Sequence, residues 1–332
     1  MRISSVNNRI TLKANVCEAY QDAKAVVTII SDDGIWNTPE VLDKILGERD
    51  LKCTVAGTVK NIKPYESEWK RIIKRGNIEL VNHSYNHLRI DEGKWRNNYV
   101  TLLREIIGAK HYLKKHLNVE PIAYVCPENV ITSKGYNVLD YGGYWGVRRG
   151  NRGFNSLNPQ DNKNPGGWFN LRCMGICDED ISKQIRNEWI DECVEDNKWL
   201  IEMWHNVIEE ADGGYQSILL KDAQTHLDYI SQKNKNNEIW VATFNEAIKY
   251  LREKQNTTLS AYILDGKMHI ESELILNPGL FDHELTINVL LPKGMKIRDD
   301  SVDIWMDRKN EYVARINITP GIDSIYDVFW EE

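Results

Sequence analysis

The stretch AVVTIISDDG, from Ala25 to Gly34, decides the fold. It is a run of apolar and β-branched residues that ends in two adjacent carboxylates, Asp32 and Asp33, followed by a glycine. Such a run is typical of a buried strand in a parallel sheet. We therefore predict a strand whose C-terminal end carries acidic side chains to a surface.

A second stretch, NIELVNHSYNH from Asn77 to His87, is another short apolar run that ends in His83 and His87. Two imidazoles four positions apart can converge on one point from a helical turn or a tight loop. Together with one carboxylate they leave open coordination positions on a divalent metal ion, as a hydrolytic site needs. The alternative is an N-capping acidic pair and two surface histidines.

The segments SDDG, from Ser31, and HSYNH, from His83, resemble the first two motifs of the polysaccharide deacetylases, the NodB-homology carbohydrate esterases. The usual forms there are T-F-D-D-G and H-[ST]-x-x-H. The resemblance spans roughly residues 25–254. It implies that Asp33, His83 and His87 bind one divalent metal ion, zinc by default, and that Asp32 is the general base. Adjacent strand residues point to opposite sides, so the two aspartates are not expected to share one role.

The segment YVCPEN matches the third family motif, R-x-P-[YFW], only at Pro127. Glu128 replaces the aromatic residue, and the resemblance implies that its main-chain N–H contributes to the oxyanion hole. The arginine that orients the catalytic aspartate in the family is absent from this motif. Arg148 or Arg149 is a candidate replacement, and a solvated arginine pair is the alternative.

The segment EMWH resembles the final L-x-H motif, with Met203 in place of leucine. The resemblance implies that His205 is the general acid for the leaving group, whereas a lone histidine at a strand end can also be structural. Trp36 and Trp204 lie beside these motifs and are candidate platforms for a sugar ring, with core packing as the alternative.

The order of elements predicts the architecture. Strand-like and helix-like segments alternate between residues 25 and 254, which is typical of a parallel α/β barrel with its site on the C-terminal face. We expect a long helix over residues 98–117, a short strand over residues 141–145 and a capping box formed by Thr243 and Glu246. The family resemblance implies a distorted, incomplete (β/α) barrel, which we assign to residues 1–254.

After residue 256 the pattern changes. Residues 257–332 show apolar residues at alternate positions and turn signals, with no helix between them. This periodicity predicts a small accessory domain of antiparallel strands, similar to a β-sandwich.

Composition narrows the classes of partner. Apolar residues make up 42% of the chain, charged residues 27%, and the net charge is −7 with no basic cluster, so nucleic acid is not an expected partner. No run approaches the ~20 apolar residues of a membrane span. The N-terminal residues lack the apolar core of a signal peptide, and the compartment and oligomeric state stay open. The six cysteines show no zinc-like pairing and are expected to be free thiols.

These observations together favour a metal-dependent hydrolase that removes acetyl groups from a carbohydrate by means of a metal-activated water, with the acetyl group on nitrogen or on oxygen. The expected partner is an acetylated carbohydrate. Eleven tryptophans and fifteen tyrosines against five phenylalanines suit contacts with sugar rings. The alternative is a catalytically inactive carbohydrate-binding protein on the same barrel.

Overall fold

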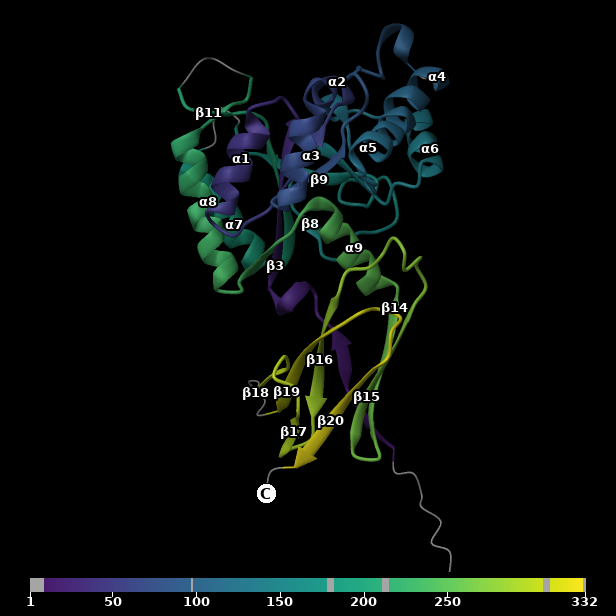
Figure 1. Ribbon diagram of the computed structural model, residues 1–332, viewed down its shortest axis with the longest axis vertical. Helices are drawn as coiled ribbons and strands as arrows, with labels where there is room; N and C mark the ends of the chain where they lie inside the picture. Colours follow the sequence, from purple (N-terminus) through teal and green to yellow (C-terminus); the bar gives the residue numbers. More distant parts are fainter. Residues whose placement is uncertain (1–8, 97, 178–181, 211–214, 307–310, 331–332) are drawn as a thin grey trace, which may run out of the picture. The chain divides into compact units, whose positions relative to one another are not determined.

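The computed structural model describes residues 9–96, 98–177, 182–210, 215–306 and 311–330. The chain forms two compact units, one of residues 24–248 and one that combines residues 1–23 with residues 249–332. Each unit is built around its own sheets (Figure 1).

The larger unit is a parallel β barrel surrounded by helices (Figure 1). In the described part of the chain, parallel strands form a ring that closes where β10 pairs with β3. The ring strands are β3 (Ala25–Asp33), β4 (Cys53–Gly57), β5 (Ile78–Asn82), β6 (Ala123–Val125), β7 (Gly146–Arg152), β9 (Leu171–Gly175) and β10 (Lys198–Trp204). The predicted distorted, incomplete barrel is confirmed: the ring has seven strands where a complete (β/α) barrel has eight.

Short strands and helices complete this unit. Strand β13 (Ile239–Val241) lies parallel to β3, and β8 (Asn155–Ser156) lies antiparallel to β10. Strands β11 (Val207–Ile208) and β12 (Ile218–Leu219) pair with each other. The helices are α1 (Thr38–Gly47), α2 (Val59–Ile62), α3 (Glu66–Arg75), α4 (Tyr99–Leu102), α5 (Ala109–Leu117), α6 (Ser133–Tyr141), α7 (Lys183–Glu195), α8 (Leu220–Lys235) and α9 (Phe244–Gln255), the last of which continues into the second unit.

Strand β3 is buried on both faces because its two sets of alternate side chains meet different partners. Val27 and Ile29 pack in the layer that contains Leu42 of α1. Thr28 faces the other way and accepts a hydrogen bond of 3.0 Å from the indole N–H of Trp199 on β10. The apolar run from Ala25 is therefore a strand of the barrel wall that is buried on both sides.

The second unit consists of two antiparallel sheets with buried apolar residues on each, including Met268 and Ile287. Their strands are β1 (Ile10–Leu12), β2 (Ala14–Val16), β14 (Thr257–Leu264), β15 (Lys267–Leu274), β16 (Leu285–Leu291), β17 (Met295–Ile297), β18 (Asp303–Met306), β19 (Tyr312–Ile318) and β20 (Ser324–Trp330). The antiparallel fold predicted after residue 256 is confirmed in this unit.

The N-terminal segment belongs to the second unit, whereas the domain limits predicted from the sequence assigned it to the barrel domain. Strand β1 pairs with β14, and β2 pairs with β16. Residues 1–8, which those limits placed in the barrel domain, lie outside the described residues. The six cysteines are all within the described residues, and none of them forms a disulfide, as expected. No described helix is long and apolar enough to cross a membrane.

Candidate active site

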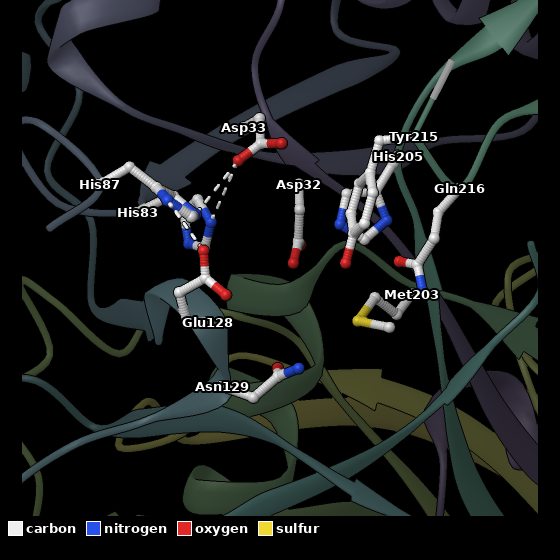
Figure 2. Close-up of a pocket in the computed structure, with 10 residues that line it drawn as sticks. All are labelled: Asp32, Asp33, His83, His87, Glu128, Asn129, Met203, His205, Tyr215 and Gln216. Atoms are coloured by element: carbon white, nitrogen blue, oxygen red, sulfur yellow. Dashed lines mark ion pairs between the residues drawn. The ribbon is translucent and has the colours of Figure 1, made fainter. Parts of the chain in front are cut away.

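The polar residues that follow the barrel strands meet in one pocket (Figure 2). Most of them come from the C-terminal ends of β3, β5 and β10 and from the turn after β6, and Tyr215 and Gln216 come from the segment before β12. The side chains that line the pocket are Asp32, Asp33, His83, His87, Glu128, Asn129, Met203, His205, Tyr215 and Gln216. This is the face on which (β/α) barrels carry their active sites.

Both aspartates reach the pocket because the backbone turns at Asp33. Strand alternation would place Asp33 on the helix-facing side with Val27 and Ile29, but its φ is 72°, outside the extended region. Gly34 follows with φ 65°, and a Cβ there would lie 3.0 Å from the Cα of Gly57. The glycine of the DDG segment therefore permits the turn that brings Asp33 beside Asp32.

Asp33, His83 and His87 form a cluster whose potential ligand atoms all lie within 4.8 Å of one another. The Nε2 atoms of His83 and His87 are 3.6 and 3.3 Å from Oδ1 of Asp33. The Nδ1 of His83 lies 2.9 Å from the carbonyl oxygen of Val125, which can only accept, so this nitrogen carries the proton. The lone pair of His83 is therefore on Nε2, the atom that faces the cluster.

The loop that carries the histidines is held by a π-helical segment, Leu103–Gly108, inside the helix predicted over residues 98–117. The carboxylate of Glu105 in this segment accepts hydrogen bonds of 2.7 Å from the main-chain N–H and the side-chain amide of Asn86. The carbonyl of Ile106 accepts a 2.8 Å hydrogen bond from the amide of Asn82. Glu105 and Asn82, which sequence reasoning missed, fix the position of the histidine loop.

Asp32 forms an ion pair with Arg148 of β7, which settles which of the two candidate arginines lies in the site. Arg148 is fully buried, lies opposite Val125 in the sheet register, and also donates to Oδ1 of Asn129 at 2.9 Å. Burial alone would lower the pKa of Arg148, but the charge of Asp32 outweighs it and raises the pKa. Arg149 points elsewhere, to the carbonyl of Asn129 and the hydroxyl of Tyr136.

The ion pair leaves one oxygen of Asp32 without a partner. Oδ2 accepts from Arg148, whereas Oδ1 is buried and has no hydrogen-bond partner among the described residues. In Figure 2, Asp32 lies between the histidine pair and His205, and its carboxylate points into the pocket. This oxygen is therefore placed to accept a proton from a molecule in the pocket.

The turn Pro127–Asn129 follows β6 and forms another wall of the pocket. Pro127 is buried, and Glu128 has a left-handed backbone with φ 51°. The Glu128 carboxylate extends into the pocket, where Oε1 is 3.7 Å from Nδ1 of His87. Replacement of the aromatic residue of the third motif by Glu128 thus adds a carboxylate to the pocket wall.

His205 lies at the end of β10, with its ring edge-on to Tyr215 at 5.2 Å between centroids. Burial lowers the pKa of His205, although the charges of Asp32 and Asp33 oppose this. At Asp33 burial alone would raise the pKa, but the hydrogen bond and charge of His83, with further charges, outweigh it, so the pKa is lowered. Burial also lowers the pKa of His87. The pocket therefore favours the ionised form of Asp33, whereas burial favours the neutral forms of His87 and His205.

The two tryptophans lie outside this pocket. Trp36 is half-buried, stacks on Tyr65 at 5.2 Å between centroids and borders a neighbouring pocket with Asn206. Trp204 is completely buried and donates its indole N–H to Glu202 at 2.9 Å. The prediction that Trp204 is a sugar platform is therefore wrong, because strand alternation turns its ring away from the pocket and into the core.

The chain is similar to one family of known sequences and to several solved structures. Residues 19–145 match the sequence model of the polysaccharide deacetylase family. A candidate polysaccharide deacetylase from Mycobacterium smegmatis has a TM-score of 0.54 at 13% identity, over 74% of this chain and 96% of that one. The Xyl-CE4 domain of a xylanase from the hindgut metagenome of Trinervitermes trinervoides has a TM-score of 0.48 at 17% identity, over 68% of this chain and 90% of that one. No curated protein sequence matches the chain.

The match over residues 19–145 covers the first part of the barrel and includes both the SDDG and the HSYNH segments. It confirms the resemblance to the polysaccharide deacetylase family, with NodB homology, that these two segments predicted.

Proposed function

We propose that the protein is a metal-dependent hydrolase that removes acetyl groups from a carbohydrate. The observation that carries this proposal is that one pocket contains a cluster of two histidines and an aspartate next to a second, arginine-paired aspartate and a further histidine. These are the groups that a hydrolytic metal site with separate acid and base needs.

Asp33, His83 and His87 would bind the metal ion. Their donor atoms converge, and the protonation of His83 on Nδ1 leaves Nε2 as the ligand atom. Two imidazoles and one carboxylate suit zinc, which we take as the default ion. When bound, the ion would polarise the acetyl carbonyl and lower the pKa of a water molecule.

Asp32 would act as the general base. Its Oδ2 is held by Arg148, so its free Oδ1 has a fixed position from which to take a proton from the attacking water. The main-chain N–H of Glu128, fixed by the turn at Pro127, would stabilise the negative charge that forms on the acetyl oxygen.

His205 would give a proton to the oxygen or nitrogen of the departing sugar. An imidazole can carry a proton near neutral pH, and the charges of Asp32 and Asp33 favour the protonated form of His205, although burial opposes it. Trp36, at the border of the neighbouring pocket, would contact the sugar next to the acetyl group.

The test is release of acetate by the full-length protein from N-acetylated chitooligosaccharides and from O-acetylated xylooligosaccharides, before and after chelation of the metal. Release from either substrate that stops on chelation and returns with zinc supports the proposal and identifies the bond. Metal-loaded protein that binds both saccharides but releases no acetate would contradict it and support the inactive binding protein.

We expect His205→Ala to keep its metal but to lose about 10²–10⁴-fold in turnover, because proton transfer to the leaving group is removed. Acetate release at full metal occupancy measures this. His111→Ala, an exposed histidine on α5, is the matched control and should leave turnover unchanged. A near wild-type rate in His205→Ala would remove this residue from the mechanism.

Two adjacent arginines give a second test. Arg148→Met removes the guanidinium from Asp32 and should lower turnover by about 10–10²-fold, the range typical for loss of a group that orients a functional side chain. Arg149→Met, on the same strand, removes the side-chain hydrogen bonds to Asn129 and Tyr136 and leaves the Asp32 ion pair intact, so it should have a much smaller effect. Equal losses of turnover in both variants, with unchanged melting temperatures, would contradict the role of Arg148.

A further inference from the structure

The four-stranded sheet of the second unit carries two rows of side chains on one face. Strand alternation puts Asn288 and Leu290 of β16 on this face, because Ile287, Val289 and Leu291 between and beside them are buried. The register of the sheet shows which residues of the neighbouring strands lie beside these two on the same face. One row is Asn15, Asn288, Arg315 and Asp303, and the other is Lys13, Leu290, Val313 and Trp305.

One end of this face is covered by the turn Tyr20–Asp22. The main-chain N–H of Gln21 donates to Oγ1 of Thr286 at 2.8 Å. The carboxylate of Asp22 accepts from the amide of Asn288 at 3.1 Å and lies 3.4 Å from the guanidinium of Arg315. Next to this cover the face is open and hollowed into a pocket that Trp305 and Asn288 border.

Two polar atoms at this place are buried without a hydrogen-bond partner among the described residues. One is Oδ1 of Asn288, whose amide nitrogen is already engaged with Asp22, and the other is Nε of Arg315. A buried acceptor and a buried donor left unpaired cost free energy unless a bound molecule or water satisfies them. Asn288 lines the pocket, whereas Arg315 lies beside it in the same row, so the unpaired acceptor of Asn288 favours a ligand that can donate a hydrogen bond.

The rest of the pocket defines the chemistry of that ligand. Trp305 is half-buried and offers an aromatic ring, with the guanidinium of Arg315 4.7 Å from its centroid. Leu290 and Val313 add apolar surface. A flat aromatic ring beside amide groups binds molecules that have both C–H faces and hydroxyl groups.

Among the described residues that line the pocket, the two charges balance. Lys13 and Glu311 border it with opposite signs, and Arg315 is paired with Asp22. A phosphate backbone would need an excess of cations here. We propose that this pocket, formed by Trp305, Asn288, Asn15, Lys13 and Glu311 over Leu290 and Val313, is a binding site for a neutral saccharide. The inference rests on residues of the second unit alone and does not depend on the proposed catalytic function.

The test is affinity electrophoresis of the full-length protein in gels that contain hydroxyethyl cellulose or neutral arabinoxylan, which carry no acetyl group for the barrel pocket to act on. Trp305→Ala should raise the dissociation constant about tenfold, because it removes the aromatic contact. Asn15→Ala, which changes an exposed side chain at the border of the pocket, should weaken binding in the same direction. Melting temperatures check that both variants are folded.

Trp330→Ala is the matched control, since Trp330 is 55% exposed on β20 of the other sheet. It should bind as the wild-type protein does. The proposal is overturned if the wild-type protein is retarded in neither gel, if Trp305→Ala and Asn15→Ala are retarded as strongly as the wild-type protein, or if retardation occurs only in a gel that contains anionic polygalacturonate.

Discussion

Replacement of Asp32 by asparagine is expected to leave the metal site occupied and to lower turnover by about 10²–10⁴-fold. The reason is that Asp32 is not part of the Asp33, His83 and His87 cluster, whereas its free Oδ1 is the pocket oxygen best placed to accept a proton. An amide of the same shape keeps the packing but cannot act as a base. Acetate release and metal content, measured on the same protein sample, separate the two effects.

Asp140→Asn, on the exposed side of α6, makes the same chemical change away from the pocket and should behave as the wild-type protein. If Asp32→Asn retained a wild-type rate at full metal occupancy, Asp32 would not be the base. If it lost the metal together with activity, Asp32 would be a ligand and the division of roles between the two aspartates would be wrong.

Local signals in the sequence were sufficient for most of the barrel. The apolar run before Asp32 forms the expected strand. The predicted capping box is also present: the main-chain N–H of Thr243 donates to the Glu246 carboxylate at 2.9 Å, and the main-chain N–H of Glu246 donates to the Thr243 hydroxyl at 3.3 Å. The prediction of a strand over residues 141–145 was wrong. Helix α6 reaches Tyr141, and Gly143 turns the chain with φ 65° before β7 begins. A short run of aromatic residues does not distinguish a strand from a helix end.

Pairings between distant segments could not be read from local patterns. Strands β1 and β2 have three residues each, too few to show a periodicity, and only the register with β14 and β16 assigns them to the second unit. The partner of Asp32 is a comparable case. Arg148 lies 116 positions away on β7, so the motif that lacks an arginine gives no information about which distant arginine replaces it.

The backbone geometry of the site also could not be predicted from the pattern of apolar and polar residues. Strict alternation would separate Asp32 from Asp33, and only the left-handed turn at Asp33 brings both into one pocket. Alternation does hold at Trp204, which faces the buried Glu202 and His226 pair rather than the pocket. Proximity to His205 in the sequence was therefore a poor guide to proximity in space.

Removal of either metal-binding imidazole is expected to abolish stoichiometric zinc binding. His83→Ala and His87→Ala each delete one of three proposed ligands. Removal of a hydrogen-bond partner of a ligand lowers metal affinity by about 10–10²-fold, and removal of the ligand itself should lower it further. Elemental analysis after dialysis measures the content directly. A bound ion also stabilises the folded state, by about 2.7 kcal/mol at a free concentration of 100 Kd, so chelation should lower the melting temperature of the wild-type protein.

The two variants are informative together because they differ in how much each should destabilise the folded protein. His83 is buried and its Nδ1–H donates to Val125, so His83→Ala removes a hydrogen bond as well as a ligand. His87 is 30% exposed at its side chain, so His87→Ala should fold like the wild-type protein and still lose the metal. Its melting temperature should then be the same with and without chelator, whereas the exposed control His111→Ala should keep the wild-type shift. Undiminished zinc in both His83→Ala and His87→Ala would rule out this cluster as the metal site.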